Sequence, residues 1–129
     1  MYFFSRAGWN DGHTATWAFT EIDRTFALGA YIDHPILKKI ENTFGFAVLV
    51  NDISPQHCDY LNTSGVDFII GDGKLPHCAP EKILETFYNV SISKHVGLML
   101  DYQYVQNPAY NADRGSVPYI ISSRVHILF

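Results

Sequence analysis

The sequence predicts an all-β protein, built as one antiparallel sheet of about six strands, and three observations support this. Apolar and polar residues alternate with a period of two over most of the chain, as side chains do along a strand. The longest purely apolar stretch, 46–50, is far shorter than the ~18 residues that a membrane-spanning helix needs. Aromatic residues make up 15% of the 129 residues and charged residues only 17%, against the ~25% charged residues that are usual in soluble domains. If the chain lies in a membrane, it must therefore cross it as strands.

The first half of the chain holds three of the expected strands. The segment 2–9 is strand-like, and either set of its alternate residues can face lipid. The segment 22–32 carries an apolar face that only Arg24 interrupts. In 43–50, phenylalanine and valine alternate with small residues and one leucine.

The second half holds the other three. The segments 84–92 and 95–104 each have one apolar and one mostly polar face, and the short connection through 91–94 joins them as a hairpin. The last strand runs to the end of the chain. Counting back from the terminus in twos gives a mostly apolar face, formed by Phe129, Ile127, Val125, Ser123, Ile121, Tyr119 and Val117. That face fits either lipid or the core of a soluble sandwich.

The connections differ in length in a way that is typical of outer-membrane barrels. In an up-and-down sheet, the tight hairpin lies on the same side as the C-terminus and the longest connection, about 51–80, lies on the other side. This long connection is expected to be external. Ser54 followed by Pro55 predicts a short helix in it, and Gly71-Asp72-Gly73 predicts a turn.

Composition and motifs exclude several functions. A net charge of -4 and the lack of a basic run argue against a nucleic-acid partner. The N-terminus does not resemble a secretory signal, so we expect either a soluble protein or a mature or truncated piece of a longer one. Glu21 with Asp23, or Glu85 with Asp101, could be the paired carboxylates of a glycosidase. Since no catalytic or nucleotide-binding motif accompanies them, we expect neither an enzyme nor a cofactor.

Several short strings, in this order and spacing, resemble the C-terminal part of the carbohydrate-selective porins of the OprB family. The strings are Gly8-Trp9-Asn10-Asp11-Gly12, Thr14-Ala15-Thr16-Trp17-Ala18-Phe19, Ile53-Ser54-Pro55, Gly71-Asp72-Gly73, Glu81-Lys82-Ile83-Leu84-Glu85 and the run from Asp101-Tyr102-Gln103-Tyr104 through Val105-Gln106 to Asn107-Pro108. Each string is weak alone, but together they span essentially the whole chain.

The resemblance implies part of a barrel of about sixteen strands, through which sugars and small solutes diffuse across the Gram-negative outer membrane. The chain would supply about the last six strands. Because eight strands are the usual minimum for a membrane barrel, we expect the isolated chain to form no pore. The expected partners are outer-membrane lipid, sugars or small solutes, and the barrel-assembly machinery, whose C-terminal recognition signal the final Phe129 resembles.

If the more apolar face of each strand contacts lipid, the opposite residues project into the lumen. The residues expected there are Glu21, Asp23, Glu85, Asn89, Asp101, Gln103, Arg124 and His126. Carboxylate and amide acceptors and arginine donors suit hydroxyl-rich solutes. There is a simpler interpretation, in which such a residue only hydrates the inner wall and contacts no solute. For any one of these residues considered alone, this simpler interpretation is favoured.

Two His-Cys pairs, His57-Cys58 and His77-Cys78, fall in the long connection. Three states are open for the cysteines: a Cys58–Cys78 disulfide, two free thiols, or a metal site. The adjacent spacing is not that of zinc fingers, whose paired ligands have residues between them. An external loop lies in an oxidising setting, so the disulfide is favoured over the free thiols and over metal.

A rival interpretation is a small soluble β-barrel that binds an apolar ligand. In that case the apolar faces would point inward, and the chain would be monomeric in plain buffer.

Overall fold

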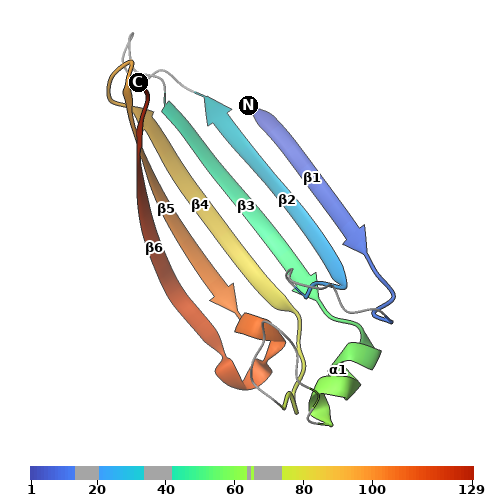
Figure 1. Cartoon of the computed structure of the whole chain (residues 1–129). Coiled ribbons are helices and arrows are strands. Elements are labelled where there is room, and N and C mark those ends of the chain that lie inside the picture. The colour runs from blue at the N-terminus through green and yellow to red at the C-terminus, as the bar shows by residue number, and fades with distance from the viewer. Residues whose placement is uncertain (14–20, 34–41, 64, 66–73) are drawn as a thin grey trace.

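The computed structural model describes residues 1–13, 21–33, 42–63, 65 and 74–129. These residues form one antiparallel sheet of six strands in sequential order, β1 to β6, as Figure 1 shows. The strands are β1 Tyr2–Trp9, β2 Arg24–Asp33, β3 Asn42–Asp52, β4 Glu81–Ser91, β5 Val96–Gln106 and β6 Ser116–Ile127. The predicted all-β, antiparallel architecture is thus confirmed. The turn expected at Gly71-Asp72-Gly73 lies outside the described residues.

Some strand limits differ from those predicted. The second strand begins at Arg24 rather than at residue 22, and the last ends at Ile127 rather than at Phe129. The fourth begins earlier than predicted, at Glu81. In each case the alternating pattern and the paired strand have different limits. Alternation shows which way successive side chains point, but it does not show where the hydrogen bonds to the neighbouring strand begin or end.

The pairing register gives the sheet two faces of different character. On the first, called the apolar face, one cross-strand row runs through Phe3, Ala30, Phe46, Thr86, Tyr102 and Ile121. On the second, called the polar face, a row runs through Phe4, Gly29, Ala47, Glu85, Gln103 and Ile120. Large side chains of the apolar face are exposed, among them Leu28 at 47% and Ile121 at 74%. No described element covers either face with a hydrophobic core.

A bulge in β6 changes which residues share a face. Gln103 pairs with Ile120 and Val105 pairs with Val117, so β6 advances by one residue more than β5. The extra residue turns Val117 to the polar face. The prediction that alternate residues from Phe129 back to Val117 all share the apolar face is therefore wrong for Val117.

The hydrophobic core lies at one end of the sheet rather than on a face. Within the described residues, the buried cluster consists of Ile53, Leu61, Leu75 and Tyr110. Here the helix α1, Pro55–Asn62, meets two 3₁₀ turns, η1 Pro108–Tyr110 and η2 Ala112–Arg114. Figure 1 places this group, called the loop cluster, at the end of the sheet opposite to both termini.

Helix α1 begins as the sequence predicted. Ser54 is its N-cap, and the Ser54 hydroxyl accepts a hydrogen bond of 3.1 Å from the His57 N–H. Pro55 follows, where its missing N–H costs no helical hydrogen bond. The helix is short, so its position depends on the contacts of the loop cluster.

Candidate functional site

Six of the residues predicted to line a lumen lie on the polar face. They are Glu85, Asn89, Asp101, Gln103, Arg124 and His126. Their strands β4 to β6 form one continuous wall, as Figure 1 shows. The wall faces no described element, so its polar groups are available to water or to a solute.

Asp101 is the centre of a small hydrogen-bonded group on this wall. One of its carboxylate oxygens, Oδ2, accepts from Gln103 Nε2 at 3.2 Å and from Ser122 Oγ at 3.3 Å. The other oxygen, Oδ1, is buried and has no partner among the residues that the structure describes. Because this oxygen is buried, it is not exposed to a solute from outside the chain.

Asn89 and His126 come together near the tight hairpin. Both line a hollow of about 130 Å³, which also includes Lys94 and His95 of the connection. The hairpin itself is closed by a 3.0 Å hydrogen bond from Ser93 N to Val96 O. These two predicted residues are thus far along the strands from the loop cluster.

Glu21 and Asp23 are placed differently from the prediction. Both precede β2 and both are only 5% exposed, so no strand carries them. Asp23 Oδ2 accepts a 2.6 Å hydrogen bond from Ser54 N and lies 3.1 Å from His57 Nδ1. The Asp23 carboxylate therefore fastens the loop after β1 to the start of α1.

We expect Asp23→Ala to weaken the loop cluster by about 1–3 kcal/mol, because the buried Ser54 N–H would lose its acceptor. Hydrogen exchange of the Ser54 and His57 amides measures this loss. Asp11→Ala is the matched control, since Asp11 accepts a 3.0 Å hydrogen bond from His13 N in the same loop but is exposed. Equal exchange in both variants would contradict the fastening role of Asp23.

A disulfide joins Cys58 of α1 to Cys78. The segment around Cys78 is in turn paired with the last loop: Cys78 bridges Asn111, Ala79 N donates to Tyr110 O at 2.8 Å, and Ala112 N donates to His77 O at 2.9 Å. The disulfide and these contacts thus join α1, the segment around Cys78 and the loop between β5 and β6. His77 pairs with Asp113 at 2.9 Å, in an exposed contact that contributes little to stability.

Tyr110 lies in the centre of the loop cluster and is 6% exposed. Burial first, and then the nearby carboxylates of Glu81, Asp23, Glu21 and Asp52, raise the pKa of the Tyr110 hydroxyl above its usual value of 10.0. Both causes disfavour the phenolate. The hydroxyl is therefore neutral in the folded loop cluster over the physiological pH range.

This raised pKa predicts alkaline sensitivity. A group with a higher pKa in the folded state stabilises fully below its unfolded value and less as the pH rises above it. We expect the loop cluster to lose stability above about pH 10, and Tyr110→Phe to remove part of that loss. Thermal unfolding between pH 8 and 11, followed by limited proteolysis of the loops, measures it. An identical alkaline loss in Tyr110→Phe would show that another group is responsible.

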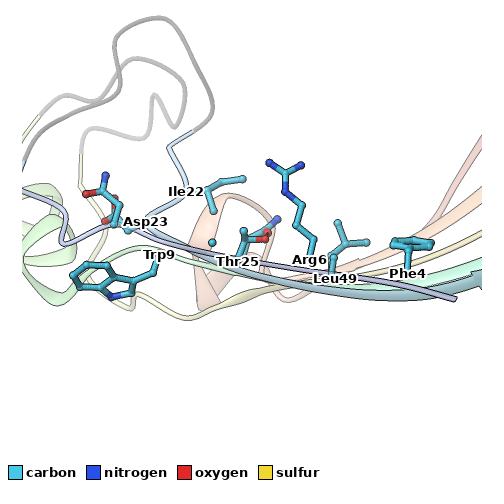
Figure 2. Close-up of a pocket in the computed structure, with 11 residues that line it drawn as sticks. Phe4, Arg6, Trp9, Ile22, Asp23, Thr25 and Leu49 are labelled. Atoms are coloured by element: carbon cyan, nitrogen blue, oxygen red, sulfur yellow. The ribbon is translucent and has the colours of Figure 1, made fainter.

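A hollow of about 750 Å³ opens on the polar face between the strands and the loop cluster. It is lined mainly by β1, β2 and β3, including Phe4, Arg6, Thr25, Leu49 and Asn51. Figure 2 shows the side chains of Arg6, Thr25 and Leu49 on the same side of the sheet, whereas the Trp9 ring points to the other side. The hollow is of the size that small-molecule sites usually have.

Polar contacts connect the floor of this hollow across three strands. Thr25 Oγ1 donates to Asn51 Oδ1 at 2.8 Å, and Asn51 Nδ2 lies 3.4 Å from Glu81 Oε1. Glu81 Oε2 accepts from Ala109 N at 3.0 Å, which connects the wall to η1. By contrast, no described residue bonds or pairs with the Arg6 side chain.

The sequence prediction did not include Arg6, Thr25, Asn51 and Glu81. One signal was available for Arg6: it is the single charged residue of a strand that is otherwise apolar and small, and it fixes which face of β1 is polar. The cross-strand chain from Thr25 to Glu81 depends on the register of three strands, which alternation within each strand does not give.

Two features are absent from the described residues. None of the described helices is long and apolar enough to cross a membrane. The same residues contain no group of three or more His, Cys, Asp or Glu side chains placed to hold a metal ion.

The comparison with protein families agrees with the geometry of the two faces. A family model described as carbohydrate-selective porin, OprB family, matches residues 1–129, which is the whole chain. No curated protein and no solved structure matches the chain. Porins of this kind are outer-membrane channels and not an enzyme class. The chain belongs to the OprB family of carbohydrate-selective porins.

Proposed function

We propose that the chain forms a wall segment of a channel through which sugars and other small solutes diffuse passively across the outer membrane of a Gram-negative bacterium. The observation that carries this proposal is the contrast between the two sheet faces. The apolar face exposes large side chains such as Phe46 and Leu100 in mid-strand, and the polar face carries carboxylates, amides and an arginine. Lipid on one side and water on the other suits such a sheet.

The same proposal assigns the ends of the sheet. The connection at about 51–80, with α1 and the disulfide, would be the long external loop, and the tight hairpin at 92–95 would face the periplasm. The disulfide supports this orientation, because disulfides persist outside the reducing cytosol. The side chains proposed to line the lumen are Glu85, Asn89, Asp101, Gln103, Arg124 and His126.

We further propose that the chain acts as part of a larger barrel. Six strands in one open sheet leave the outer edges of β1 and β6 without a neighbour in the described structure. An unpaired backbone group in lipid costs several kcal/mol, and eight strands are the usual minimum for closure. Recognition of the last strand by the barrel-assembly machinery stays a prediction.

The test uses a chimera in which this chain replaces the last six strands of a family porin. We expect proteoliposomes with the chimera to take up glucose at a rate proportional to its concentration gradient, as diffusion requires. The chain alone should partition into detergent and give no uptake. A chimera that inserts but passes no sugar would contradict the proposed function, and a monodisperse monomer of the chain in plain buffer would favour the soluble barrel instead.

A further inference from the structure

Three aromatic rings gather on the polar face of β1 and β2, where the proposed lumen needs only polar side chains. Tyr2 pairs with Tyr31 across the two strands, and their rings stack with centroids 4.9 Å apart and an angle of 20° between the ring planes. Phe4 lies two residues further along β1 on the same face, about 7 Å away by strand geometry. Tyr2 is 55% exposed and Phe4 is 45% exposed, so the rings are accessible.

The Phe4 ring lies flat against the sheet, and a glycine makes this possible. Phe4 pairs with Gly29, and a Cβ atom at that position would collide with Cζ and Cε1 of the ring. Figure 2 shows the ring lying along the surface of the strands. One π-face is therefore turned toward the open side of the polar face.

This arrangement is repeated once on the same face. Phe87 of β4 pairs with Gly45 of β3, and a Cβ atom on Gly45 would collide with the Phe87 ring. Gly45 also pairs with Tyr31, so the stacked tyrosines and Phe87 lie in one cross-strand row. The next residues in that row are Asp101 and Ser122, the hydrogen-bonded group described above.

Polar donors and acceptors line the same hollow as the Phe4 ring. Arg6 is the next residue of β1 on the same face, and its guanidinium carries donors that no described residue uses. Thr25 and Asn51 continue the polar surface, and the hollow of about 750 Å³ contains all four residues. The site thus combines a flat aromatic floor with hydrogen-bonding groups on one side.

We propose that Phe4, Arg6 and the Tyr2–Tyr31 stack form a binding site for neutral pyranose sugars at the wall of the channel; this rests on the proposed function. A pyranose ring has a face of C–H groups and a rim of hydroxyls. The positively polarised C–H groups pack on the negative face of an aromatic ring, while the hydroxyl oxygens accept from the arginine fork. The spacing of about 7 Å from Phe4 to the tyrosine stack lets a sugar move from one ring to the next.

A matched pair of variants on neighbouring residues tests the site. The chain is folded in detergent micelles and titrated with methyl β-D-glucopyranoside, and binding is followed by saturation-transfer NMR. We expect Phe4→Leu to weaken binding about fivefold, which corresponds to ~1 kcal/mol. Phe3→Leu should bind as the unchanged chain does, because Phe3 lies on the apolar face of the same strand and is 72% exposed.

Two further measurements separate stacking from nonspecific hydrogen bonding. Glucitol has comparable hydroxyls but no ring, and we expect it not to compete with the glucoside. Arg6→Gln should weaken binding several-fold while leaving the ring contacts in place. No binding to the unchanged chain, equal binding by Phe4→Leu, or equal losses in Phe3→Leu and Phe4→Leu would each overturn the proposal.

Failure of this site is distinguishable from failure of the channel function. If the chimera passes glucose but Phe4→Leu does not alter binding in micelles, the site is wrong and the channel proposal stands. If binding in micelles depends on Phe4 but the chimera passes no glucose, the channel proposal is wrong and the site remains as a sugar-binding surface.

Discussion

We expect Val48→Arg to lower the stability of the membrane-inserted sheet by about 2–4 kcal/mol, the range measured for arginine on the lipid face of a barrel at mid-depth. Val48 lies in the middle of β3 on the apolar face, where it pairs with Leu28 and Leu84. A guanidinium at this position would have to leave water and enter hydrocarbon. The cost should fall for arginine substitutions nearer the strand ends.

Leu49→Arg is the matched control for this substitution. Leu49 is the next residue of β3 but belongs to the polar face, between Ala27 and Ile83. An arginine there can remain hydrated, so we expect a change below about 1 kcal/mol. Urea titration of the chimera, folded into lipid vesicles and carrying one substitution or the other, measures both by far-UV circular dichroism. If the two variants lose equal stability, or if the loss is larger in Leu49→Arg, the assignment of the faces is wrong.

Removal of the disulfide, by Cys58→Ser with Cys78→Ser, is expected to destabilise the loop cluster by about 3 kcal/mol. The two cysteines are 20 residues apart in the sequence, and closing a loop of that length restricts the unfolded chain by about this amount. The effect should stay local. The buried cluster of Ile53, Leu61, Leu75 and Tyr110 would lose its covalent tie, whereas the ladders of the sheet would be unchanged.

Limited proteolysis measures this prediction, with cleavage in 53–80 expected to accelerate about a hundredfold in the double variant. Cleavage within β4 and β5 should remain as slow as in the unchanged chain. Chemical reduction of the unchanged chain should reproduce the same pattern. Unaltered cleavage in 53–80 would show that packing alone holds the loop cluster.

The strands were predictable because one-sided burial imposes a period of two, and this period survives even where neither face is packed against a core. The helix start was predictable for a local reason, since a serine N-cap followed by proline satisfies its own backbone groups. The ends of the strands were less predictable than the strands themselves. Alternation continued through Ile22 and Asp23, although neither belongs to a strand. The Asp23 carboxylate binds Ser54 N in the loop cluster, and the Asp23 N–H donates to Asp52 O.

The candidate site was predictable only in part, because its contacts join strands whose relative register the sequence does not state. Asp101 and Gln103 are two residues apart on β5, and alternation alone places them on one face. The Tyr2–Tyr31 stack and the Phe4–Gly29 contact depend on the pairing of β1 with β2. The Cys58–Cys78 bond could be favoured by its setting, but only the fold brings the two Cα atoms to 6.1 Å.

The central claim, that lipid contacts the apolar face and water the polar face, is tested most directly by a tryptophan scan of β3 with brominated lipids. Trp9 and Trp17 are first replaced by phenylalanine, and single tryptophans are then introduced at each position from Phe46 to Val50. We predict that bromolipid quenches the fluorescence strongly at the even-numbered positions and weakly at the odd-numbered ones. Quenching with the opposite parity, or at no position, would contradict the account.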